Sequence, residues 1–232
     1  MRRLKLMAVP LAGILCVGGL GGLAYASSQF TQASNVTLTA TKSGKPTGFK
    51  ASLLSSDPGA VQPQGLKTLT ITFPANTRFN FKSTAIKQCK ASEVEIKATL
   101  GKACPAKSRI GTGTAVANGA PVIPVIPENA AAFAGAKRII FLLTPKGSAG
   151  QVLVLYGSVA ANKVTTQVPV INTGGLNVVI TALDLTVKTI GSGSNAFVTA
   201  GKCTKGKFGV TSHFVYQSGA QLTLTSSSKC VK

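Results

Sequence analysis

The sequence predicts an all-β protein, a two-layer antiparallel β-sandwich of jelly-roll type with one short helix near residues 92–100. Three observations support this fold class. The chain of 232 residues is rich in Val, Thr, Ile, Ala and Gly and has no Trp. Apolar and polar residues alternate over many short runs, as in half-buried strands. Gly, Pro, Asn and Ser separate these runs, which favours roughly ten to twelve strands joined by short links.

The N-terminus has the pattern of a secretion signal. A cationic head at residues 2–5 precedes a largely apolar run at 6–23, and Ala24-Tyr25-Ala26 offers the small-x-small pattern of a cleavage site. We therefore expect residues 1–26 to be a cleaved signal peptide. Residues 27–232 are then expected to form a single secreted, extracellular domain, either free or associated with the cell wall.

Two other interpretations of this segment are weaker. The pair Arg2-Arg3 is reminiscent of a twin-arginine signal, but the polar residue before the pair is missing. Ordinary secretion is favoured, although the export route stays open. Cys16 follows Leu15, where lipid attachment requires a small side chain, so we expect an incidental cysteine.

The first strands follow from alternation and turn residues. Residues 35–40 and 49–54 have the pattern of half-buried strands, and Asp57-Pro58-Gly59 indicates a turn. Apolar residues alternate with threonines in 68–73, and Pro74 ends that strand.

A helix is predicted over 92–100. Ser92 and Glu95 have the spacing of a capping box, and Glu93 lies at the positive end of the helix dipole. Gly101 is placed to end the helix. Glu93 and Glu95 are not expected to form a catalytic pair, because two positions on a helix differ by about 200°.

The middle of the chain combines strands with a proline-rich segment. Residues 105–118 alternate as a strand, and prolines at every third position of 121–127 have the period of a polyproline II helix. We expect 121–127 to be an extended crossover between sheets. The apolar run at 138–144 predicts a strand buried on both faces, with 151–159 returning as its hairpin partner.

The last strands alternate regularly. They are predicted at 164–171, 176–181, 183–187, 208–217 and 221–225.

Four cysteines remain after signal cleavage: Cys89, Cys104, Cys203 and Cys230. An even number in a secreted chain implies two disulfides, for which three pairings exist. The spacing favours Cys89–Cys104 and Cys203–Cys230. Metal ligation is the weaker alternative, because there is no CxxC motif and His213 is the only histidine.

No catalytic, cofactor-binding or metal-binding motif is found. There is no P-loop, GxGxxG, HExxH or GxSxG pattern. The acids are few and scattered: Asp57, Glu93, Glu95, Glu128 and Asp184. We therefore expect no enzyme activity, no cofactor and no metal ion.

Basic charge is the one positive functional signal. The net charge of +20 falls to +17 once Arg2, Arg3 and Lys5 leave with the signal. The first dense cluster predicts an anion-binding patch of Arg78, Lys82, Lys87, Lys90, Lys97, Lys102, Lys107 and Arg109. A second cluster, Lys202, Lys205 and Lys207, surrounds Cys203. Such charge attracts an anionic cell-wall polymer or a membrane surface. Sequence-specific nucleic-acid binding is not expected, since no nucleic-acid motif accompanies the charge. An ordinary solvated surface is the competing interpretation.

Two segments resemble secreted, functionally uncharacterised β-sandwich proteins of actinobacteria. The resemblance rests on Cys89 with the CPxxSxIGxG segment at 104–113, and on the closing segment 203–219 with its terminal Cys230. It implies a disulfide-bonded β-sandwich with neighbouring cysteines paired, and it implies no activity.

Together these observations favour a secreted or cell-wall-associated, non-enzymatic structural or interaction module with a cationic surface. The alternative is a secreted glycan-binding or glycan-processing domain. A cleft that gathers Asp184, Glu128 or His213 would favour the alternative, whereas a flat basic face would favour the module. The oligomeric state stays open.

Overall fold

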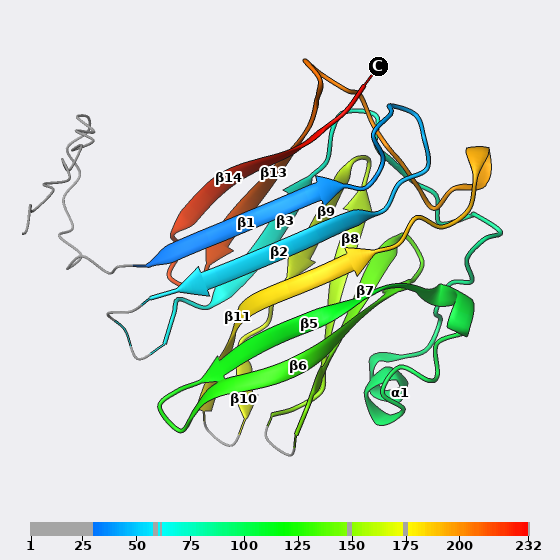
Figure 1. The fold of residues 1–232 in the computed structure, drawn as a ribbon. Coiled ribbons are helices and arrows are strands. Elements are labelled where there is room, and N and C mark those ends of the chain that lie inside the picture. Colours follow the sequence, from blue (N-terminus) through cyan, green and yellow to red (C-terminus); the bar gives the residue numbers. More distant parts are fainter. Residues whose placement is uncertain (1–29, 58–59, 61, 148–149, 174–175, 232) are drawn as a thin grey trace, which may run out of the picture.

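The structure is a computed structural model that describes residues 30–57, 60, 62–147, 150–173 and 176–231. These residues form an almost entirely antiparallel β fold with one α-helix (Figure 1). The predicted all-β class and the single helix are thus confirmed. The predicted signal peptide, residues 1–26, lies outside the described residues.

The strands have the following bounds. The first half contains β1 (Thr31–Leu38), β2 (Phe49–Ser56), β3 (Leu66–Thr72), β4 (Arg78–Phe79), β5 (Arg109–Gly119) and β6 (Ile123–Ala134). The second half contains β7 (Arg138–Pro145), β8 (Leu153–Ala160), β9 (Lys163–Gln167), β10 (Ile171–Thr173), β11 (Leu176–Val187), β12 (Val198–Thr199), β13 (Lys207–Tyr216) and β14 (Gln221–Lys229). The helix is α1 (Glu93–Ala98).

One continuous sheet holds most of the strands. Its order is β1-β2-β11-β5-β6-β7-β8-β9-β3-β13-β14, with β10 paired to β11, and β4 and β12 form a separate two-stranded ribbon. The two edges of the sheet meet. The Val36 N–H of β1 donates to the Ser226 Oγ of β14 at 2.9 Å, and that hydroxyl donates back to the Val36 carbonyl at 2.8 Å. The sheet therefore nearly closes on itself.

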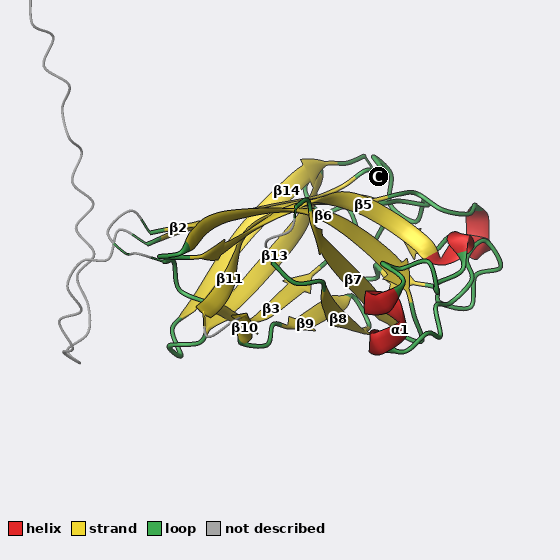
Figure 2. Ribbon diagram, turned by 90° about the horizontal axis from the view of Figure 1, so that it is seen from below, coloured by secondary structure: helices red, strands yellow, loops and turns green. Residues whose placement is uncertain are grey.

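The sheet is flattened, so that its halves face each other across the core. Figure 2 shows β2 and β5 in one layer and β8 and β9 in the other. The core between the layers includes Val36, Phe49, Ile139, Phe208 and Phe214, none more than 5% exposed. Two layers were expected, but the strands are linked by one hydrogen-bonded path rather than divided between two separate sheets.

The proline-rich segment is a strand, and the predicted crossover at 121–127 is wrong. Residues from Ile123 onward pair with β5, with Ile126 opposite Ala117 and Pro127 opposite Val116. On its other side β6 meets β7 only from Glu128 onward. The Pro127 carbonyl accepts a bond from the Lys146 N–H at 2.9 Å, just beyond the end of β7. The prolines therefore lie at or beyond the end of the pairing with β7, where a missing N–H costs little.

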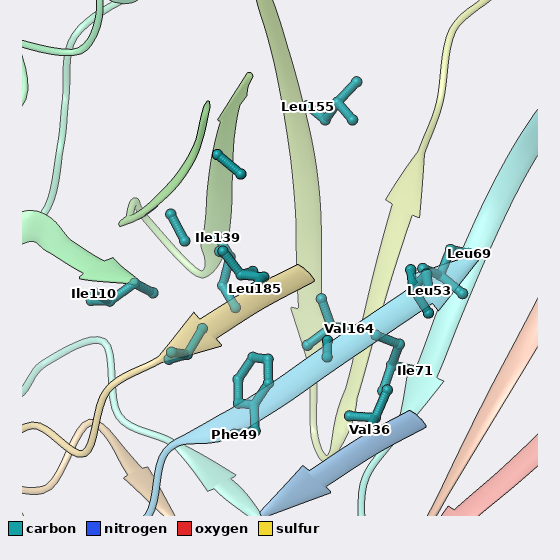
Figure 3. Packing of buried hydrophobic residues seen from close by; sticks show 14 of the residues in the cluster. Val36, Phe49, Leu53, Leu69, Ile71, Ile110, Ile139, Leu155, Val164 and Leu185 are labelled. Atoms are coloured by element: carbon teal, nitrogen blue, oxygen red, sulfur yellow. The ribbon is translucent and has the colours of Figure 1, made fainter. Parts of the chain in front are cut away.

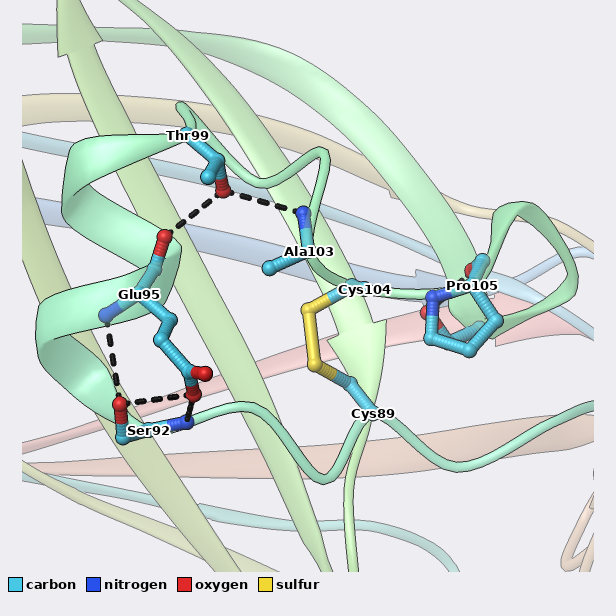
Figure 4. The surroundings of a disulfide bond; sticks show 8 residues. Cys89, Ser92, Glu95, Thr99, Ala103, Cys104 and Pro105 are labelled. Carbon is cyan, nitrogen blue, oxygen red and sulfur yellow. Dashed lines mark hydrogen bonds between the residues drawn. A yellow bond between two sulfur atoms is a disulfide. The ribbon is translucent and has the colours of Figure 1, made fainter.

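α1 packs against the outer face of the sheet, and it begins with the capping box that the sequence predicted. The Glu95 N–H donates to the Ser92 hydroxyl, and the Ser92 N–H donates to the Glu95 carboxylate at 2.7 Å (Figure 4). Ile96 is fully buried in a small cluster with residues of β6, β7 and β8. Gly101 follows at φ +83°, where a Cβ would lie 2.9 Å from Phe133 and Leu142.

Both predicted disulfides are present. Cys89–Cys104 ties the two ends of the α1 segment together (Figure 4), with the Cα atoms 4.8 Å apart. Cys203–Cys230 joins the chain before β13 to the end of β14. Within the described residues, no helix is both long and apolar enough to cross a membrane.

Candidate functional site

Basic side chains gather at one end of the sheet. We call this the cationic end; it is formed by the loops 39–48, 73–92, 99–108, 135–137, 161–162 and 188–206, toward which β1 and β11 run in Figure 1. Its cations, all outside the main sheet, are Lys42, Lys45, Arg78, Lys82, Lys87, Lys90, Lys102, Lys107, Lys137, Lys188, Lys202 and Lys205. None of these loops carries an acid. Among the described cations, only Lys67 and Lys146 lie at the opposite end of the sheet, the end that also carries Asp57.

The largest hollow of this end is a cleft of about 1400 Å³, which we call the end cleft. Three cations line it, namely Arg78, Lys137 and Lys202, and no acid is among its lining residues. Amide and hydroxyl groups, such as those of Asn76 and Asn162, also line the cleft. The arrangement suits a ligand with several negative charges and hydroxyl groups.

The three cations of the end cleft come from segments far apart in the sequence. Arg78 lies on β4, where it pairs with Thr199 of β12. The Lys202 N–H donates to the Ala75 carbonyl at 2.7 Å. Lys137 occupies the turn between β6 and β7 at φ +53°, and its carbonyl accepts a bond from the Val159 N–H. Backbone pairing or a backbone hydrogen bond thus fixes the main chain at each of the three cations.

Aromatic packing supports the floor of this cleft. Phe79 and Phe81 both line it and both pack edge-on against the fully buried Phe197, with ring centroids 6.3 Å and 5.4 Å apart. Phe79 also contacts Phe73 of the main core at 5.4 Å. The cleft is therefore anchored to the rigid part of the fold.

The eight residues of the predicted patch are spread over several surfaces. Arg78 reaches the end cleft, whereas Lys82, Lys87, Lys90 and Lys107 are exposed on the segments that flank α1. Lys97 forms an ion pair with Glu93 at 2.6 Å, which offsets its charge. Lys102 and Arg109 line a hollow of about 410 Å³ beside the apolar Phe133 and Leu142.

Sequence reasoning missed Lys137 as a member of this site. The available signal was its place in a short turn, Gly135-Ala136-Lys137, between two predicted strands. Lys202 was noticed only as part of a second cluster beside Cys203. Its proximity to Arg78 depends on pairing between β4 and β12, which are too short to be predicted from alternation.

The three residues that could have marked a catalytic cleft are not brought together. Glu128 is 2% exposed on an inward position of β6, while Asp184 is exposed on β11. His213 is half-buried on β13, within 3.2 Å of Gln221. The Glu128 side chain faces the core and the Asp184 side chain faces solvent, so the sheet lies between the two carboxyl groups.

Glu128 has an unusual environment for an acid. Its inward neighbours on β6 are the buried Ile126 and Ala130, and its cross-strand partner on β5 is Ala115. Oε2 of Glu128 has no hydrogen-bond partner. Loss of hydration on burial raises the pKa of this carboxyl to about 7.

Asp184 belongs to a shallow polar hollow on the outer face of β1, β2, β11 and β5. The hollow has a volume of about 360 Å³ and includes Asn35, Lys50, Thr114 and Thr186. These side chains offer donors and acceptors of the kind that bind sugar hydroxyls. Across the part of the chain that the structure covers, no three His, Cys, Asp or Glu side chains are grouped as metal ligands would be.

Comparison with known proteins gives no assignment. The chain matches no protein-family model, no curated protein and no solved structure.

Proposed function

We propose that this protein is a secreted or cell-wall-associated, non-enzymatic interaction module that binds an anionic wall polymer with its cationic end. The observation that carries the proposal is the separation of charge. Most described cations lie toward one end of the sheet, and three of them line an acid-free cleft of about 1400 Å³. Two disulfides are typical of proteins in an oxidising, extracellular environment, which agrees with this location.

Binding would combine a long-range electrostatic field with a local cleft. Clustered charges of one sign attract a polyanion from solution and orient the protein as it approaches. Arg78 adds a planar guanidinium that can bind a phosphate group through two hydrogen bonds, while lysines act as point charges. A repeating phosphate polymer fits both features. We also propose that the two facing layers act as a sandwich-like, jelly-roll-type scaffold that holds these loops.

The experiment compares two double variants with the same loss of charge. Lys137→Gln/Lys202→Gln removes two cations of the end cleft, and Lys67→Gln/Lys146→Gln removes two from the opposite end. Each lysine near an anionic surface contributes about 1 kcal/mol to binding. We therefore expect the first variant to bind poly(glycerol phosphate) roughly 30-fold more weakly than the parent. The control should bind almost as well as the parent.

Salt and ligand controls complete the test. Parent binding should fall steeply as salt rises from about 0.01 M to 1 M, because the screening length shortens from about 30 Å to about 3 Å. Phosphatidylglycerol vesicles, measured in parallel, distinguish a membrane surface from a wall polymer. Equal losses in the two double variants would show that net charge, and not the end cleft, governs binding.

The polar hollow around Asp184 favours a second candidate function, glycan binding. A neutral polysaccharide should then bind without strong salt dependence, and Asp184→Asn should weaken it. Retention of neutral glycan by the Lys137→Gln/Lys202→Gln variant would separate this activity from polyanion binding.

A further inference from the structure

The space between the two layers is not completely filled. A cavity of about 90 Å³, which we call the inner cavity, is lined by side chains from both layers, including Phe49 and Leu53 of β2 and Leu69 and Ile71 of β3. Figure 3 shows several of these side chains reaching into the same region from facing strands. Among the described residues that line it, only Gln32, Ser55, Thr166 and Thr181 are polar.

The lining of the inner cavity extends along one strand. Along β2 its lining runs from Phe49 to Ser55, which corresponds to about 20 Å at roughly 3.3 Å per residue. A single water-sized group needs about 10–15 Å³ of such space. The cavity therefore admits several methylene-sized groups in single file, but it is too thin for a ring system.

The two ends of the cavity lining differ in burial. The lining residues nearest the cationic end, such as Phe73 and Leu185, are buried. The lining residues at the other end, such as Leu66, Ile180 and Leu183, remain half-buried although they face the interior. The more exposed end, which we call the opening, thus lies away from the cationic end.

A second hollow adjoins this opening. It has a volume of about 230 Å³ and shares Leu66, Val168 and Ile180 with the inner cavity. Gln62, Asn177 and Gln217 supply its polar side chains, and no charged residue lines it. It can therefore hold an uncharged group that forms hydrogen bonds.

We propose that the inner cavity binds one unbranched hydrocarbon chain, with an uncharged, hydroxyl-bearing head in the adjoining hollow. The ligand class is that of a monoacylglycerol. The chain matches the apolar walls and the narrow bore, and the head matches the amide groups at the opening. This site is separate from the cationic end, so its occupancy does not depend on the proposed polyanion binding.

The test uses monoacylglycerols of increasing chain length, measured by calorimetry and by the thermal midpoint of the protein. We expect one bound molecule per chain, little salt dependence, and affinity that rises with chain length and then levels off as the cavity fills. Glycerol and cholesterol should not bind, because the first has no chain and the second is too wide. Laurate should bind more weakly than monolauroylglycerol, since no cation lines the opening.

Two neighbouring substitutions provide the matched control. Ala51 lines the cavity, whereas Ser52 points to the outer face and is exposed. Ala51→Leu should fill part of the cavity and weaken monolauroylglycerol binding at least tenfold, with an unchanged or higher thermal midpoint. Ser52→Leu should bind as the parent does. If Ala51→Leu does not fold, Ala130→Val on β6 fills another part of the cavity. Binding that survives the cavity-filling variant, or that is independent of chain length, overturns the proposal.

Discussion

At the scale of single residues, Glu128 is the feature that a surface view of this protein would miss. It is the one acid at an inward position of the sheet, and it is surrounded by alanines and aliphatic side chains. Burial of a carboxylate is unfavourable because the charge loses its hydration. The fold must therefore tolerate either a buried charge or a bound proton at this position.

The pH dependence of stability follows from the pKa of Glu128. In the unfolded chain this carboxyl titrates near 4.5, and in the folded protein near 7. Below about pH 4.5 Glu128 is protonated in both states, and its ionisation no longer lowers the free energy of unfolding. As pH rises from 4.5 to 7, the unfolded state loses its proton first and stability falls, reaching a plateau above pH 7.

We predict that Glu128→Gln removes this pH-dependent loss. At pH 8 the variant should be more stable than the parent by about 3 kcal/mol, since one pKa unit corresponds to about 1.4 kcal/mol. At pH 4 the two proteins should have the same free energy of unfolding. Urea titrations at both pH values measure the difference. A gain of equal size at pH 4 would mean that packing, and not ionisation, is responsible.

At the scale of elements, the segment from Cys89 to Cys104 shows how a local pattern becomes a fixed structure. A six-residue helix is too short to be stable alone, even with the capping box at Ser92. Burial of Ile96 against β7 and β8 and the disulfide across its ends hold it on the sheet. The capping signal determined where the helix begins, while the sheet determined where it lies.

We predict that each disulfide stabilises the fold by about 3 kcal/mol through loop closure in the unfolded chain. Cys89→Ala/Cys104→Ala should lower the free energy of unfolding by about that amount and release α1 first. Hydrogen exchange should therefore speed up over 93–104, while β13 stays protected. Non-reducing peptide mapping checks the pairing, and a Cys89–Cys203 peptide would contradict it.

At the scale of the whole molecule, the separation of charge connects the fold to the proposed function. The loops that carry the cations come from many parts of the chain, and the antiparallel order brings them to the same end of the sheet. Exposed charges contribute little to folding, so they can be changed without loss of the scaffold.

We predict that replacing Lys97, Lys102, Lys107 and Arg109 by Gln weakens poly(glycerol phosphate) binding at low salt. The thermal midpoint should hardly change. Because Lys97 is paired with Glu93, restoring Lys97 alone should recover little of the binding. If the quadruple variant binds as the parent does, these four side chains are only solvated surface.

Processing is also a property of the whole chain. The small-x-small pattern at Ala24-Tyr25-Ala26 predicts a mature N-terminus at Ser27. N-terminal sequencing of protein collected from the medium measures this directly. A retained Met1, or lipid on Cys16, would contradict the predicted signal.

Much of the architecture could be predicted because local physics determines it. Strands such as β13 alternate between buried and outward positions, and the capping box and both disulfides followed from spacing. The same alternation in β6 placed Glu128 between Ile126 and Ala130, a signal for an inward acid that was available in the sequence. The segment at 121–127 was misassigned because prolines in a strand depend on which side has a neighbour.

The sequence by itself determined most of the long strands, the helix cap and the disulfides, because each depends on residues close together in the chain, and it determined the excess of positive charge through composition alone. Tertiary structure decided three things: the near closure of one sheet through Val36 and Ser226, the meeting of Arg78, Lys137 and Lys202 in one cleft, and the unfilled space between the layers. These depend on pairing between distant strands and on how side chains from facing layers fill a shared volume. Alternation with a period of two residues predicts the face of the sheet on which a side chain lies. It does not predict which side chains of the facing layer it contacts across the core.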